Sequence, residues 1–182
     1  MRQKILLFIL FLVIGVPTLN CQTNASGKQN SADEKTKPCK FLSFADAEKI
    51  LGQPVELVTN SWTFTTGKTR FDCTYRGVGK DEASGKDVNL YFSSEEIQQN
   101  PTAEQAHEVF ESAFRKINEP DIFVGRLSGI GDEAFLISNP PNFHFLMVRK
   151  GVTIFRIKLN KAGKGTSLEE LKAFMKNIAG RI

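Results

Sequence analysis

Apolar residues recur along this chain with two periods, one typical of helices and one typical of strands. Three segments have the helical spacing of three and four residues. The first is bounded by Ser43 as an N-cap and Gly52 as the stop. The second opens at Pro101 with Asn100 as its cap, and the third begins with a capping box at Ser167. The pattern therefore predicts three helices at well-separated places in the chain.

Strand-like runs lie between these helices and are separated by turns that contain glycine. Three runs come between the first two helices, and three or four come between the second and the third. The mostly short links favour antiparallel pairing. We therefore expect an α+β domain in which an antiparallel sheet of about six strands packs with three helices. The runs are Val55–Thr65, Arg70–Arg76, Asp87–Phe92, Ile122–Leu127, Glu133–Ile137, Phe143–Arg149 and Val152–Leu159.

The last two runs form a predicted hairpin across the two-residue turn Lys150-Gly151, which pairs residues whose numbers sum to 301. One face of this hairpin is uniformly apolar apart from His144 and Thr153, which predicts a core face. The other face mixes large apolar side chains with cations. Besides Val152, this face contains the seven residues of a candidate binding surface: Phe143, Phe145, Met147, Arg149, Ile154, Arg156 and Lys158.

Two interpretations of the mixed face remain open. In the commoner arrangement a helix or the N-terminal segment covers the apolar half, and the cationic side chains extend to water. In the other, the seven residues bind an anionic, partly apolar ligand such as a lipid headgroup, a glycan or a partner segment. A pocket over Phe145 and Arg156 would favour a small ligand. A flat or helix-covered face would favour an interaction role.

The first twenty residues have the organisation of a signal peptide. Arg2 and Lys4 precede an apolar run of twelve residues, Ile5–Val16, which is too short to span a membrane. We expect residues 1–20 to be removed on export. The sequence Thr18-Leu19-Asn20-Cys21 resembles a bacterial lipobox, although the usual leucine is one place late and Asn20 occupies the small-residue position. Cys21 is therefore the predicted site of lipidation.

Residues 21–37 contain no large apolar side chain, so they cannot bury enough surface to offset the entropy of ordering. This composition predicts a flexible tether between a lipid on Cys21 and a single domain spanning residues 38–182. The expected location is the cell envelope, with the protein held to a membrane and facing the periplasm or the outside. Without lipidation, the protein would be secreted.

The formal charge of the whole chain is +4, but +3 of it belongs to residues 1–37, which carry five cations and two acidic residues. Only +1 remains for residues 38–182 when the leader and tether are left out. A nucleic-acid-binding domain would need a concentrated basic stripe. The composition therefore gives no support for binding to nucleic acid.

The chain has three cysteines. With Cys21 assigned to lipid, Cys39 and Cys73 remain, and an oxidising compartment favours a disulfide between them. A metal-binding or catalytic thiol is the alternative, but neither cysteine has a neighbouring histidine or a C-x-x-C spacing in the sequence. We therefore predict a structural disulfide.

Several short motifs together resemble a family of uncharacterised bacterial lipoprotein domains. They are Pro38-Cys39, Ile50-Leu51-Gly52, Pro54-Val55, Cys73-x-Tyr75, Gly129-Ile130-Gly131-Asp132-Glu133-Ala134-Phe135 and Val148-Arg149-Lys150-Gly151-Val152. More distantly, the layout is similar to the extracellular sensor domain of a mycobacterial receptor kinase, which has a second disulfide that this chain lacks. The resemblance implies an envelope location and helices packed on an antiparallel sheet, with no established activity.

No catalytic constellation stands out in the sequence. His107 and His144 are far apart, so we predict no metal site and treat both as structural histidines. Gly125-Arg126-Leu127-Ser128-Gly129 has the wrong spacing for a nucleophile elbow, and the glycine-rich stretch before Asp87 has the wrong spacing for a phosphate loop. We therefore expect no catalytic residues and no cofactor.

These features predict an exported, membrane-anchored lipoprotein that acts as a non-enzymatic module binding a ligand or partner in the cell envelope. Its expected partners are the membrane, through the N-terminal lipid, and an anionic amphipathic ligand or an envelope protein. One alternative is an enzyme acting on an envelope polymer. Another is a purely structural or surface-interaction lipoprotein.

Overall fold

The computed structural model describes residues 39–82, 84–97, 102–117, 121–162 and 165–182. The predicted leader, tether, lipidation site at Cys21, first domain residue Pro38 and helix start at Asn100-Pro101 lie outside these residues. The elements in chain order are α1 (Phe44–Leu51), β1 (Val55–Thr65), β2 (Lys68–Lys80), β3 (Asp87–Ile97), α2 (Ala103–Arg115), β4 (Phe123–Leu127), β5 (Glu133–Asn139), β6 (Phe143–Lys150), β7 (Thr153–Leu159) and α3 (Leu168–Ala179).

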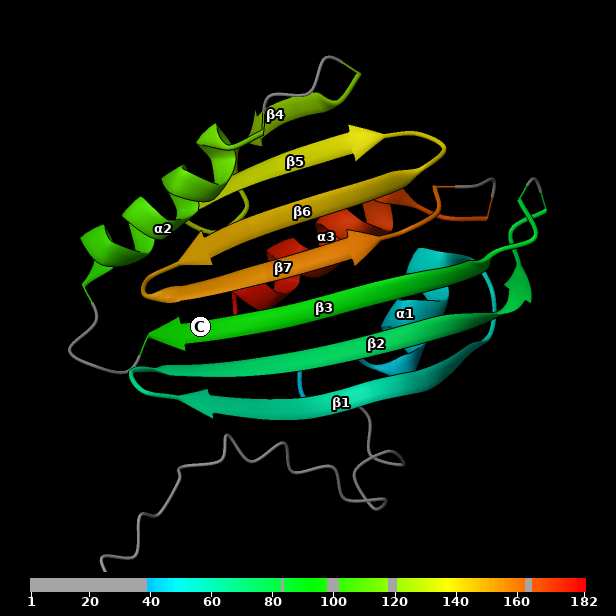
Figure 1. The fold of residues 1–182 in the computed structure, drawn as a ribbon, viewed down its shortest axis with the longest axis horizontal. Helices are drawn as coiled ribbons and strands as arrows, with labels where there is room; N and C mark the ends of the chain where they lie inside the picture. The colour runs from blue at the N-terminus through cyan, green and yellow to red at the C-terminus, as the bar shows by residue number, and fades with distance from the viewer. Residues whose placement is uncertain (1–38, 83, 98–101, 118–120, 163–164) are drawn as a thin grey trace, which may run out of the picture.

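The strands form one seven-stranded sheet in the order β1-β2-β3-β7-β6-β5-β4, and every neighbouring pair is antiparallel. Strands β1 to β3 make one meander and β4 to β7 make another, and the two meanders join where β3 pairs with β7 (Figure 1). This confirms the predicted α+β class. The sheet has one strand more than the predicted six because 123–127 pairs with β5 as an edge strand.

Helices cover the two faces of the sheet unequally. Helices α1 and α3 pack on one face, and their apolar stripes join the main core with residues such as Phe71, Leu90 and Phe155. Helix α2 lies on the opposite face over β5, β6 and β7 (Figure 1), where Phe110 packs with Phe135 in a second apolar cluster. No helix of the described residues covers the part of this second face formed by β1, β2 and β3. It is called the open face below.

The predicted bridge between Cys39 and Cys73 is present. It fastens the segment before α1 to β2, and both cysteines are buried. The hydroxyl of Tyr75, two residues along β2, donates to the backbone carbonyl of Leu42 at 2.9 Å. The disulfide and this hydrogen bond together hold the entry to α1 against the sheet.

Strands β2 and β3 are longer than the sequence pattern predicts. The predicted second run ends at Arg76, but β2 continues to Lys80. Its extension is held by two hydrogen bonds to residues just before β1: the amide of Val78 donates to the carbonyl of Pro54, and the amide of Gly79 donates to the side chain of Gln53. The predicted third run ends at Phe92, but Ser93 and Ser94 continue β3 since they pair with β7. Their burial comes from a neighbouring strand far away in sequence, so local alternation does not reveal it.

The turn of the β6–β7 hairpin also differs from the prediction. Lys150 pairs with Thr153, so Gly151-Val152 forms the two-residue connection and facing residues sum to 303 rather than 301. Gly151 has φ of 56°, which glycine adopts without steric cost, and its amide donates to Asp132 at 2.8 Å. Because the register changes by two residues, every side chain keeps its predicted face.

The first helix starts as predicted, with a capping box between Ser43 and Asp46. The second helix begins at Ala103, and its N-cap is Thr102 rather than the predicted Asn100. Thr102 and Gln105 form a reciprocal capping box, whose hydrogen bonds satisfy two backbone amides at the start of the helix.

Candidate functional site

The seven residues of the predicted ligand face separate into three groups in the structure. Met147 and Ile154 are fully buried under α2, so they belong to the core and cannot contact a ligand. Phe143 and Phe145 pack at the edge of the same cluster. The remaining three are cations: Arg149 turns toward acidic residues at one end of the sheet, whereas Arg156 and Lys158 face the open side.

A hollow of about 220 Å³ lies at the border between the open face and the neighbouring strands β7 and β6. Phe145, Arg156 and Lys158 form one side of it. The other side consists of β2 and β3 residues that the sequence reasoning missed. These are Arg70, Asp72, Cys73, Thr74, Tyr91, Phe92 and Ser93.

Strand register explains why these residues meet. On this face Lys158 is flanked by Tyr91 of β3 and Phe145 of β6, and Arg156 is flanked by Ser93 of β3. The alternation of polar residues in β2 signals that Arg70, Asp72 and Thr74 share a face. The sequence does not reveal that this face adjoins β7, because that contact passes through the pairing of β3 with β7.

Cations outnumber carboxylates around the hollow. Arg70 is paired with Asp72 at 2.7 Å, and Lys68 is paired with Glu95 at 3.0 Å. Arg156 also contacts Glu95, at a longer distance of 3.4 Å. Lys158 has no carboxylate within ion-pair distance among the described residues, and its Nζ lies 5.5 Å from the ring centre of Phe143. Four cations thus share two carboxylates, which leaves a local formal charge of +2.

Arg156 is partly buried, so its positive charge is only partly screened by water. Its side chain is 23% exposed, and burial lowers its pKa, while the charge of Glu95 partly opposes that shift. An arginine remains protonated at neutral pH in spite of such a shift. Burial raises the pKa of Glu95, but its hydrogen bond from Lys68 and the surrounding cations outweigh this effect and hold the pKa below its ordinary value. The hollow is therefore a partly desolvated positive site, suited to an anionic group.

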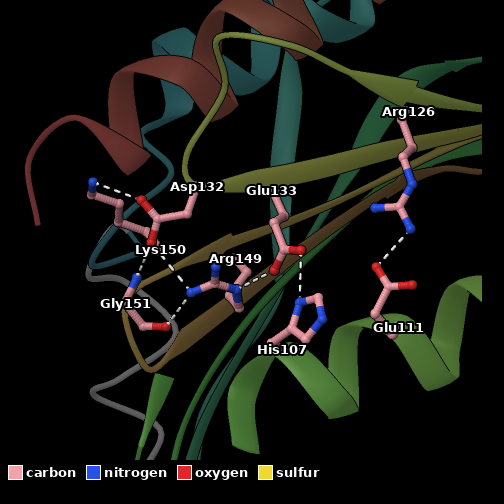
Figure 2. A network of polar contacts seen from close by, with 8 residues as sticks. All are labelled: His107, Glu111, Arg126, Asp132, Glu133, Arg149, Lys150 and Gly151. Carbon is pink, nitrogen blue, oxygen red and sulfur yellow. Dashed lines mark hydrogen bonds and ion pairs between the residues drawn. The ribbon is translucent and has the colours of Figure 1, made fainter. Parts of the chain in front are cut away.

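A second polar cluster joins α2 to the ends of β4, β5 and β6 (Figure 2). The ring Nδ1 of His107 lies 2.7 Å from Glu133, and Glu133 also accepts a hydrogen bond from Arg149. Nearby, Glu111 accepts from Arg126 at 2.6 Å. Asp132 accepts from the side chain of Lys150 and from the amide of Gly151, and it lies 3.3 Å from Arg149, which closes the network around the hairpin turn.

Ligand atoms of His107, Glu111 and Glu133 lie within 4.8 Å of one another, so these three residues could hold a divalent cation. The sequence reasoning missed this juxtaposition because Glu133 is distant from α2 along the chain. Each carboxylate is already neutralised by an arginine, Arg126 for Glu111 and Arg149 for Glu133. Since the two arginines would repel a dication, we interpret the cluster as a set of ion pairs and hydrogen bonds that hold α2 against the sheet.

The structure also brings a serine and a histidine together, as Ser138 Oγ and His144 Nδ1 are 2.7 Å apart. Both residues are buried at 7% exposure, so a substrate does not reach them. Burial lowers the pKa of His144, and the charge of Lys172 adds to the effect. The hydrogen bond between them therefore satisfies both polar side chains within the core.

A larger hollow, about 690 Å³, lies between Gln53, Lys80, Val88 and Pro141 at the loop end of the sheet. Loops make up most of its described lining, in which the one cation, Lys80, is paired with Asp87. No helix in the described part of the chain is long and apolar enough to cross a membrane.

Comparison with known proteins adds no relative. No family model, no curated protein and no solved structure matches this chain. The resemblance to bacterial lipoprotein domains and to the receptor-kinase sensor therefore stays a prediction from the sequence motifs.

Proposed function

We propose that this chain is an exported lipoprotein, anchored through Cys21, whose domain binds a small anionic ligand in the hollow of the open face. The observation that carries the ligand proposal is the excess of two positive charges around a hollow that contains the partly buried Arg156. Lys158 supplies a cation without a carboxylate partner among the described residues. Tyr91 and Phe145 supply apolar surface on either side of it.

The size of the hollow restricts the ligand. Drug-sized ligands occupy pockets of roughly 300–1,000 Å³, whereas this hollow measures about 220 Å³. It fits one phosphate or carboxylate group with a small neighbouring moiety, such as a lipid headgroup or one acidic sugar. Helix α2 covers the apolar half of the face, so a long hydrocarbon chain cannot lie over Met147 and Ile154.

The ligand proposal is tested by titrating soluble anions into the full chain carrying Cys21→Ser, purified from the periplasm of an exporting host. Inorganic phosphate, glucuronate and dihexanoylphosphatidylglycerol are the probes, with glucose and dihexanoylphosphatidylcholine as neutral matches. Binding is followed by NMR shifts of the open-face amides. We expect the anions alone to bind, with an affinity that falls as salt is added.

Variants locate the binding site. Arg156→Gln removes a charge-assisted hydrogen bond, so affinity should fall about tenfold to a hundredfold. Arg76→Gln is the matched control, because Arg76 lies on the same face but is paired with Glu56 and does not line the hollow. If no anion shifts the open-face amides, or if both variants weaken binding equally, the ligand proposal is wrong, and a structural or interaction role replaces it.

The anchor is tested separately by mass spectrometry of the protein isolated from its host. A diacylglyceryl group on Cys21 supports the proposed location. An intact leader or an unmodified Cys21 would overturn the anchor without affecting the ligand proposal. Turnover of an envelope polymer by the purified protein would favour the enzymatic alternative.

A further inference from the structure

A small aromatic surface lies at one end of the sheet, on the side covered by α1 and α3. Trp62 and Phe64 share one face of β1, and their rings stack at 6.3 Å with 10° between their planes. Phe64 is 63% exposed. The Nζ of Lys40 lies 4.9 Å from the ring centre of Phe41 and 5.2 Å from that of Trp62. Ile182 is 55% exposed and lines a small hollow together with Lys40, Phe41 and Trp62. These four residues and Phe64 are called the Trp62 patch.

The patch lies where the chain enters the domain. Cys39 is covalently bound to Cys73 of β2, and Cys73 pairs with Asn60 of β1, two residues before Trp62. The disulfide thus fixes the entry point beside the patch. Figure 1 places the end of β1 and the C-terminus at the same end of the sheet.

The length of chain before the domain keeps this end near the anchor. Cys39 lies eighteen positions after Cys21. A flexible segment of that length spans roughly 20–25 Å on average, and at most about 60–65 Å when fully extended. Lipid on Cys21 would therefore hold the entry point, and the patch beside it, within reach of the bilayer surface.

The chemistry of the patch suits the membrane interface. Tryptophan and other aromatic side chains favour the headgroup region, and lysine extends from apolar surroundings to lipid phosphates. Phe123 on the opposite edge strand is about equally exposed, at 60%. It forms no ring pair with another aromatic in the described part of the chain, and it lies far along the sheet from the entry point.

We propose that the Trp62 patch seats the domain on the membrane that carries its lipid anchor. Trp62 and Phe64 enter the headgroup region, and Lys40 contacts anionic phosphates. This inference rests on the anchored location proposed above. It assigns the orientation of the domain, which leaves the open face free to meet a soluble ligand.

Trp62 is the only tryptophan in the chain, so its fluorescence reports on the patch directly. The lipidated full-length product is reconstituted into vesicles of phosphatidylcholine and phosphatidylglycerol, prepared with and without brominated acyl chains. If the isolated protein carries no lipid, its Cys21 thiol is coupled to a maleimide-bearing lipid, because the other two cysteines are bridged. The patch is thereby tested whether or not biological lipidation occurs.

We expect brominated lipid to quench Trp62 and its emission to shift to the blue. Phe64→Ser should lower the ratio of docked to undocked protein roughly fivefold, because it removes the most exposed apolar group of the patch. Phe123→Ser is the matched control and should leave quenching unchanged. Lys40→Gln should lower the ratio roughly fivefold with phosphatidylglycerol and have no effect on vesicles of phosphatidylcholine alone.

Three results would overturn the proposal. The first is a Trp62 emission that brominated lipid does not quench in the anchored protein. The second is equal loss of quenching in Phe64→Ser and Phe123→Ser, with the thermal midpoint of each variant showing that it is folded. The third is cross-linking of Lys40 to a second copy of the chain, which would make the patch a dimer interface.

Discussion

Removal of the Cys39–Cys73 bridge should destabilise the domain by an amount that the chain-entropy model specifies. The two cysteines are 34 residues apart in sequence. Closing a loop of that length lowers the entropy of the unfolded chain enough to contribute about 3.8 kcal/mol at 25 °C. Both cysteines are buried, at 6% and 1% exposure, so the freed side chains stay packed and add little further loss. The double variant Cys39→Ala/Cys73→Ala should therefore lose about 3–5 kcal/mol of unfolding free energy.

The assay is guanidinium unfolding at equilibrium, followed by circular dichroism and by Trp62 fluorescence. The unmodified protein in reductant should lose a similar free energy, and adding reductant to the double variant should change nothing further. Cys21→Ala serves as the control, because it leaves the bridge intact and should leave the midpoint unchanged. A loss below about 1 kcal/mol in both the reduced protein and the double variant would refute the reasoning. It would show that the bridge does not constrain the unfolded chain.

Four further changes test other parts of the structure by denaturation. Thr69→Val should stabilise the protein by about 1 kcal/mol, because the buried Thr69 hydroxyl has no hydrogen-bond partner among the described residues; a loss of stability would contradict this. Gly131→Ala should cost about 2–3 kcal/mol, since φ is 61° and a Cβ there would lie 2.6 Å from a carbonyl of β6. Gly129→Ala, at a φ of 74° with open space around it, should cost only about 1 kcal/mol. Burial raises the pKa of Glu133, but the hydrogen bonds with His107 and Arg149 and the charge of Arg149 outweigh this and hold the pKa below its ordinary value of 4.5. Its contribution to stability is therefore present above pH 4.5 and lost as the pH falls through the folded-state pKa, and Glu133→Gln should flatten the unfolding free energy over that acid range.

Local chemistry accounts for most elements that the sequence predicts. The capping box at Ser43 and the left-handed Gly52 bound α1 because both act within a few residues of the helix. The two-residue period of 133–137 likewise places Ala134 and Phe135 on opposite sides of β5, in different cores. Predictions of this kind depend on neighbours along the chain, so they need no knowledge of the fold.

The candidate sites depend on contacts between distant segments. The alternation in the hairpin correctly places Phe145, Met147 and Arg156 on one face. It cannot show that α2 covers Met147 while Arg156 stays beside a hollow, because the position of α2 is determined by packing. The approach of His107 to Glu133 has the same origin, since the two residues are 26 positions apart in the sequence.

The sequence by itself determined the α+β class, the sequential order of the helices and strands, the pairing of Cys39 with Cys73 and the two faces of the final hairpin. These properties follow from short-range periodicity, from caps and turns, and from the small number of cysteines. Only the tertiary structure decided that β3 pairs with β7 and that α2 covers one half of a sheet face. Those two choices create the open face and its excess of positive charge. They depend on summed packing over segments far apart in the chain, which no local pattern of residues contains.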